Sequence, residues 1–218
     1  METMHITAEH VQDGQYIGPD VSDFAGHIEI AASLGMVAFT GPIRAAGRIR
    51  ALAGSGIKAG RGIGAGHGID AGWGIRAGEG IRAGHGIDAG RSIKAEEGIR
   101  AGHGIDAGAG IKAGHGINAG EGIRAGHGID AGHGIRAGHS IRAGEGIRAG
   151  HGIDAGAGIK AGHGIEAALQ IKAKWVFCPL RIFAGIVTWR LPRPDDDEIH
   201  AEVRGGTVAF GRVISPAT

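Results

Sequence analysis

Histidine, arginine, lysine and aspartate recur at two fixed positions of a six-residue unit. Histidines at regular intervals could bind a metal ion, or take up protons together below about pH 6.5. The nine histidines between His67 and His163 have interchangeable surroundings, and neither a cysteine partner nor an H-E-x-x-H motif accompanies them. We therefore expect polar corner residues rather than a metal site, and we expect no cofactor.

Basic side chains occupy the second position of alternate units. Arginine or lysine repeated at strand spacing could follow a phosphate backbone or another acidic partner. No aromatic residues are interleaved with them, so stacking on single-stranded bases is not expected. The predicted partner-binding residues are Arg100, Lys112, Arg124, Arg136, Arg148 and Lys160.

The unit that positions these residues is I-x-A-G-x-G. Isoleucine recurs every six residues from Ile57 to Ile171, and alanine follows each isoleucine by two. Isoleucines six apart would rotate around a helix without forming a stripe, whereas in a strand the isoleucine and alanine share one face. The G-x-G segment supplies a bend, because glycine accepts positive φ and close backbone approach. The pattern predicts short parallel strands wound into a solenoid around buried isoleucines.

Residues 57–173 resemble the hexapeptide-repeat proteins, although here isoleucine precedes the small residue instead of following it. The resemblance implies an all-β, left-handed parallel β-helix with triangular coils of three hexads. Relatives of this kind are often trimeric acyltransferases that use a histidine base at a site between subunits.

The number of hexads per coil determines which side chains meet. Three-sided coils need 18 residues, four-sided coils 24 and flattened two-sided coils 12. The block E-G-I-R-A-G-H-G-I-D begins at Glu97, Glu121 and Glu145, in steps of 24. An even number of sides would place the basic, histidine-rich units opposite mildly acidic ones, whereas a triangle would stack Asp70, Asp88 and Asp106. We favour the triangle over two- or four-sided coils.

Three segments are expected. Residues 1–56 form an N-terminal cap with imperfect coils, residues 57–174 form the solenoid, and residues 175–218 form a C-terminal β cap that could serve as an oligomer interface. Eight of the nine aromatic residues lie outside the repeat, where end coils need covering. The last segment also predicts a hairpin around Gly205-Gly206.

Charge and cysteine content exclude several classes of protein. The formal net charge is +1, from 23 basic and 22 acidic side chains, so there is no bulk attraction to nucleic acid or membranes. The one cysteine, Cys178, excludes an internal disulfide framework and fits a reducing compartment. No apolar run reaches membrane-spanning length. We expect a cytoplasmic protein.

The function expected from these observations is that of a non-catalytic rigid scaffold or protein-interaction module that works through regularly spaced surface charges. Its partner would be another protein or a further copy of the chain, joined through a cap, and nucleic acid is a weakly supported partner. Two alternatives stay open: a phage- or host-encoded inhibitor that occupies a nucleic-acid-binding site of its partner, and an acyltransferase-like enzyme. Against the enzyme, no insertion interrupts residues 57–171.

Overall fold

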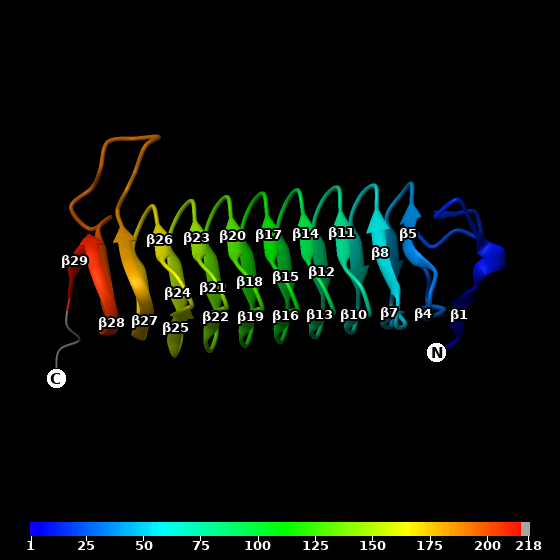
Figure 1. The fold of residues 1–218 in the computed structure, drawn as a ribbon. Coiled ribbons are helices and arrows are strands. Elements are labelled where there is room, and N and C mark those ends of the chain that lie inside the picture. The colour runs from blue at the N-terminus through cyan, green and yellow to red at the C-terminus, as the bar shows by residue number, and fades with distance from the viewer. Residues whose placement is uncertain (215–218) are drawn as a thin grey trace.

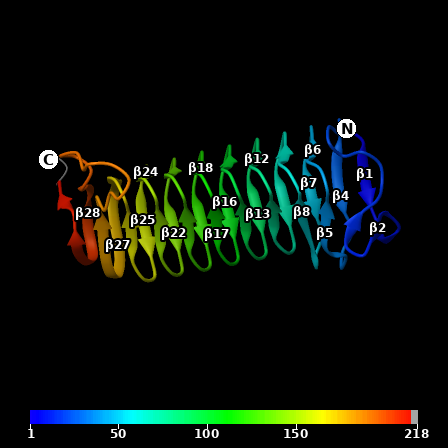
Figure 2. The same ribbon diagram turned by 90° about the horizontal axis from the view of Figure 1, so that it is seen from above.

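The computed structural model describes residues 1–214 as a long stack of parallel β-strands, with β1 at one end of the stack and β28 and β29 at the other (Figures 1 and 2). The last four residues of the expected cap 175–218 lie outside the described residues. Within the described residues there is no α-helix, and a single 3-10 turn, η1, spans Ala8–His10. None of the described segments is a helix long and apolar enough to cross a membrane. The expected all-β parallel solenoid is confirmed.

Each turn of the solenoid contains three strands. Ile81 pairs with Ile99, and Ile87 pairs with Ile105, so the register joins residues 18 apart. A register of 18 is three hexads, which confirms the three-sided coil and excludes the two- and four-sided alternatives. The left-handed winding stays a prediction from the resemblance.

The strands fall into three columns, here called faces A, B and C in the order in which the chain visits them. Face A contains β1 (Thr3–Ile6), β4 (His27–Ile30), β7 (Ile49–Ala51), β10 (Ile69–Ala71), β13 (Ile87–Ala89), β16 (Ile105–Ala107), β19 (Ile123–Ala125), β22 (Ile141–Ala143) and β25 (Gly158–Ala161). Face B contains β3 (Gln15–Tyr16), β5 (Gly35–Phe39), β8 (Ser55–Ala59), β11 (Ile75–Ala77), β14 (Ile93–Ala95), β17 (Ile111–Ala113), β20 (Ile129–Ala131), β23 (Ile147–Ala149) and β26 (Ile165–Ala167). Face C contains β6 (Ile43–Ala45), β9 (Ile63–Ala65), β12 (Ile81–Ala83), β15 (Ile99–Ala101), β18 (Ile117–Ala119), β21 (Ile135–Ala137) and β24 (Ile153–Ala155). The G-x-G corners between the faces form edges AB, BC and CA.

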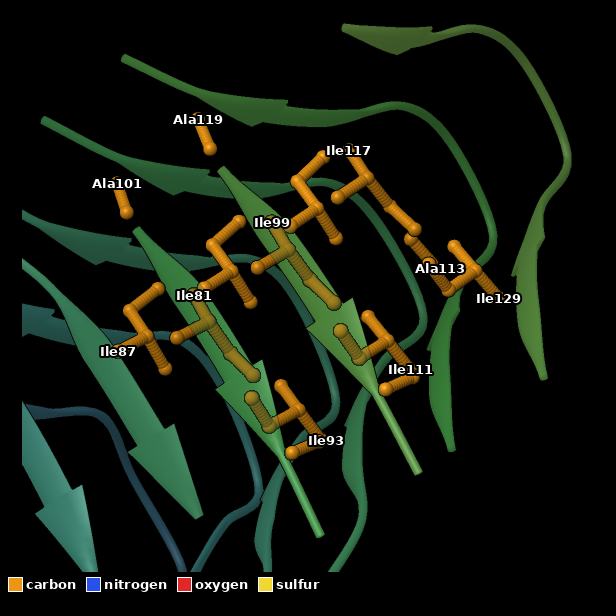
Figure 3. Close-up of a cluster of buried hydrophobic side chains, with 14 of the residues drawn as sticks. Ile81, Ile87, Ile93, Ile99, Ala101, Ile111, Ala113, Ile117, Ala119 and Ile129 are labelled. Carbon is orange, nitrogen blue, oxygen red and sulfur yellow. The ribbon is translucent and has the colours of Figure 1, made fainter. Parts of the chain in front are cut away.

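The core is a ladder of isoleucines, each stacked on the isoleucine of the next coil. Every isoleucine of the repeat is at most 2 % exposed, and the alanine two residues later is also buried, except that Ala173 at the end of the repeat is partly exposed. Figure 3 shows Ile81, Ile99 and Ile117 stacked along one face, with isoleucines of the other faces pointing toward the same interior. Burial of these side chains is the main stabilising contribution, at roughly 25 cal/mol per Å² of apolar surface. The expectation that isoleucine lines the inside of the coil is confirmed.

The repeat glycines serve close packing between coils and not an unusual backbone conformation. Among the described residues, positive φ at glycine occurs only outside the regular repeat, at positions such as Gly54 and Gly206. A Cβ on Gly120 would overlap the carbonyl oxygen of Gly102 in the preceding coil. Of the two expected reasons for the glycines, close approach is therefore confirmed and positive φ within the repeat is wrong.

The two ends depart from the hexad pattern. At the N-terminal end, β2 (Val11–Gln12) pairs antiparallel with β3, and Tyr16 packs on Phe39 with ring centroids 4.8 Å apart. At the C-terminal end, β27 (Ile171–Ala184) and β28 (Glu198–Phe210) each continue around all three faces.

The hairpin predicted around Gly205-Gly206 is wrong. The segment β28 is one strand that pairs parallel with β27 through both glycines, because the preceding coil offers a complete parallel edge. Among residues 1–214, β29 (Arg212–Val213) is the strand that pairs with part of the outer edge of β28. The end coil thus continues the solenoid instead of folding back on itself.

Candidate functional site

The six predicted partner-binding residues are all exposed, and the three-sided coil distributes them over three faces. Two lie on each face: Arg124 and Lys160 on face A, Lys112 and Arg148 on face B, and Arg100 and Arg136 on face C. The single basic, histidine-rich surface expected of an even-sided coil is therefore not formed. A role for these residues in partner binding stays a prediction.

Ion pairs between adjacent coils engage four of these six cations. Each pair joins outward side chains 18 residues apart on one face: Arg124–Asp106 at 3.0 Å, Lys112–Asp130 at 3.4 Å, Arg148–Glu166 at 3.2 Å and Arg136–Asp154 at 3.6 Å. All four pairs are largely exposed, and an exposed pair contributes only about 0–1 kcal/mol. They neutralise charge along the axis more than they stabilise the fold.

A column of four cations lies on the N-terminal half of face B. The outward residues at successive levels are Lys58, Arg76, Lys94 and Lys112. Neighbouring strands are about 4.8 Å apart, so the four charges repeat at that interval. Lys94 also pairs with Glu96 at 2.9 Å. This is the longest run of like charge in the regular coils.

Face C carries an open groove with arginines on its floor. Arg82 and Arg100 are stacked in register, and the groove continues past Asn118 to the acidic segment at Asp195 and Asp196.

The histidines stack along two edges. On edge CA, His67, His85 and His103 have parallel rings with centroids 5.1 and 5.0 Å apart. On edge BC, the corresponding stack contains His115, His133 and His151, at 5.0 and 4.8 Å. Burial, followed by the neighbouring His133 and Arg190, lowers the pKa of His151.

The stack of aspartates predicted for a triangular coil is present on face A. Asp70 pairs in register with Asp88, and Asp88 with Asp106. Burial, followed by the charges of Asp106 and Asp70, raises the pKa of Asp88. Within residues 1–214, no three histidine, cysteine, aspartate or glutamate side chains converge in a way that could hold a metal ion.

The segment between β27 and β28 folds back onto edge BC near the C-terminal end (Figure 1, orange). Trp189 contacts His151 with ring centroids 5.2 Å apart, and Gln170 donates a hydrogen bond to Asp195 at 2.9 Å. The Arg190 guanidinium donates to both carboxylate oxygens of Asp196, at 2.6 and 2.8 Å. Both partners of this ion pair belong to the segment, so the pair stabilises the conformation of the segment itself.

We expect Asp196→Asn to loosen this segment. Hydrogen bonding by Arg190 and by the backbone N–H of Arg193 lowers the pKa of Asp196, so the ionised carboxylate is the form that binds. Its contribution is present above the ordinary carboxyl pKa and is lost as the pH falls through the lowered value. Trypsin cleavage after Arg190 should become at least about tenfold faster in Asp196→Asn at neutral pH. The exposed pair Glu202–Arg204 provides the control, because Glu202→Gln should leave the cleavage rate unchanged. Equal rates in both variants would contradict the role of Asp196.

Comparison of the chain with protein-family models, with curated proteins and with solved structures finds no significant match.

Two features of these surfaces were missed by reasoning from the sequence. The cation column of face B could have been found by sorting the basic outward residues, like the aspartates, at intervals of 18. The docking of Trp189 and Asp196 near edge BC has no signal in the sequence, because it depends on the path of an irregular segment.

Proposed function

We propose that this protein is a non-catalytic rigid scaffold that presents regularly spaced charges to a macromolecular partner. The observation that carries the proposal is the alignment of one outward side chain per coil into straight columns on three faces. A partner whose own charges repeat at about 4.8 Å, or at a multiple of it, would match such a column at several points together.

The continuous core supports a rigid role. Buried isoleucines follow one another from Ile57 to Ile171 without an inserted loop, so no part of the rod has an evident hinge. The absence of an insertion in this range also supports a scaffold over an acyltransferase-like enzyme, since such enzymes shape their pocket with a loop. The nine repeat histidines occupy similar corner positions, and none of these nine has a carboxylate partner within residues 1–214 that would distinguish it as a general base.

The cation column on face B is the surface we propose for an acidic protein partner. Its four cations occupy the N-terminal half of face B, and the outward residues of this face become acidic only further along, at Asp130 and Glu166. Self-assembly through the C-terminal cap is a further part of the proposal. The partly uncovered edge of β28 and the exposed side chains of Leu191 and Phe210 support it.

A pull-down from native lysate tests the proposal. With Lys58→Glu, Arg76→Glu and Lys112→Glu combined, we expect specific partner binding to fall at least about tenfold. A matched control reverses three cations on another face, through Arg44→Glu, Arg82→Glu and Arg100→Glu on face C. Nuclease treatment separates a protein partner from a nucleic-acid partner.

Partner binding that is unchanged by the face B variant would contradict the proposed surface. Loss of binding in both variants to the same extent would show that net charge, and not the face B column, is recognised. Raising the salt concentration should weaken binding to the wild-type chain, because exposed charges are screened over about 8 Å at physiological ionic strength.

A further inference from the structure

The central six coils of face A divide into an acidic half and a basic half, with Arg50 in the coil before the acidic half. Three successive coils present Asp70, Asp88 and Asp106, and the next three present cations. In order along the axis these cations are Arg124, Arg142 and Lys160. The two halves meet at the ion pair of Arg124 with Asp106, whose atoms are 3.0 Å apart.

Away from that boundary the charges of face A are not neutralised within the chain. Four charged residues of this face form no ion pair with any other residue of 1–214: Asp70, Asp88, Arg142 and Lys160. Three carboxylates stacked at strand spacing repel one another, and burial, followed by this repulsion, raises the pKa of Asp88. A binding partner with cations at the same spacing would remove the repulsion.

The chain itself has cations at that spacing. Consider a second copy laid against face A after a half-turn about an axis parallel to the strands. This operation reverses the direction of the rod, so each aspartate faces a cation of the other copy. The opposed residues are Asp106 with Arg124, Asp88 with Arg142, and Asp70 with Lys160. A half-turn about the long axis would instead oppose aspartate to aspartate, so charge selects the antiparallel arrangement.

Several residues around this central block also match under the same half-turn, although His85 of one copy faces His139 of the other. On edge AB, Arg91 of one copy faces Glu145 of the other. On edge CA, His103 faces Glu121. Toward the ends of the face, Arg50 approaches Phe177, and a guanidinium over an aromatic ring is a favourable contact. Each contact occurs twice, as a two-fold interface requires.

Faces B and C match themselves less well. On face B, a half-turn centred on Lys112 opposes Arg76 to Arg148 and places Lys112 against itself. A half-turn centred between Asp130 and Arg148 opposes only unlike charges, but all four of them are already paired within the chain, as Lys112–Asp130 and Arg148–Glu166. On face C, a half-turn centred on Asn118 opposes Arg100 to Arg136. Face A is therefore the face on which two of the three opposed pairs use charges that have no ion pair within residues 1–214.

The size of face A suits a weak to moderate dimer. The strands of face A from β4 to β27 extend over about 40 Å along the rod, since neighbouring strands are about 4.8 Å apart. The face is about 15 Å wide across the strands. Two such faces in contact would bury about 1,200 Å² in total, at the lower limit for specific protein interfaces.

We propose that face A is a self-complementary interface through which two copies of this chain associate side by side in antiparallel orientation. The proposal deepens the scaffold function and rests on it, because it names the partner of one face. It leaves face B open for other partners and differs from assembly through the C-terminal cap.

Complementation between two single variants tests the proposal. Asp88→Arg brings two pairs of like charges together in a homodimer, and so does Arg142→Asp. Sedimentation equilibrium at low salt should show the wild-type chain associating, with each variant at least about tenfold weaker. An equimolar mixture of the two variants restores every opposed pair and should associate as tightly as the wild type.

The register is tested by a mismatched mixture. Asp88→Arg mixed with Lys160→Asp leaves position 88 facing the unchanged Arg142, so association should stay weak. Asp88 and Arg142 are exposed, and unchanged far-UV circular dichroism should show that the variants fold. The control Lys58→Asp on face B should dimerise like the wild type.

Three outcomes would overturn the proposal. They are a wild-type chain that stays monomeric at about 100 µM in low salt, single variants that associate like the wild type, and a mismatched mixture that recovers as well as the matched one. None of the three affects the pull-down through face B, because the face A variants leave that column intact. Failure here is thus distinguishable from failure of the scaffold function.

Discussion

Replacing Ile117 with alanine should lower the free energy of unfolding by about 2–5 kcal/mol. Ile117 is 1 % exposed and stacks between Ile99 and Ile135 of the adjacent coils. Removing three carbon atoms would leave a cavity that both neighbouring coils line. In a solenoid each coil contacts only its neighbours, so the coil cannot recover this loss from contacts elsewhere in the molecule.

Urea denaturation followed by circular dichroism measures this effect. The control is the adjacent outward residue, where Asn118→Ala should change stability by no more than about 0.5 kcal/mol. Equal losses at positions 117 and 118 would mean that the inside and the outside of the coil have been assigned incorrectly.

Replacing Gly120 with alanine should cost about 1–3 kcal/mol, although the change adds only one methyl group. The added Cβ would overlap the backbone carbonyl of Gly102, which no rotation of a side chain can relieve. Glu96 occupies the corresponding position in one coil, so the corner can adjust and the cost is finite.

The second glycine of the same corner is the matched control. A Cβ on Gly122 would lie 3.3 Å from the carbonyl oxygen of Ser140, which requires a shift of only a few tenths of an ångström. Serine occupies the equivalent position at Ser92 and Ser140. Gly122→Ala should therefore cost clearly less than Gly120→Ala in the same denaturation experiment. The reverse order would contradict the inter-coil packing described above.

The side chains that line the inside of the coil could be predicted from the sequence, because the spacing of isoleucine and alanine is compatible with strands and incompatible with a helix. The number of sides could not be predicted from that spacing, since a six-residue period divides coils of 12, 18 and 24 residues equally. The angle at each G-x-G corner decides the number, and it depends on how adjacent coils pack. The positions of Arg100, Arg124 and Arg148 on three different faces follow from that angle.

The C-terminal end shows a second limit of local reasoning. Gly205-Gly206 between two apolar runs is typical of a hairpin, yet the segment pairs in parallel with β27 through the whole corner. Hydrogen bonding to the free edge of the preceding coil is more favourable here than the local turn. That edge is formed by β27, so it cannot be inferred from the sequence of β28 alone.

The three-hexad coil has a consequence for how the charge pattern could have arisen. A copied block of four hexads exceeds one turn by one hexad, so each copy is displaced by one side as well as by one level. Glu97, Glu121 and Glu145 accordingly occupy edges BC, CA and AB in succession. Tandem duplication of such a block produces a stripe that spirals around the rod, whereas duplication in units of 18 residues would produce straight lines of identical residues.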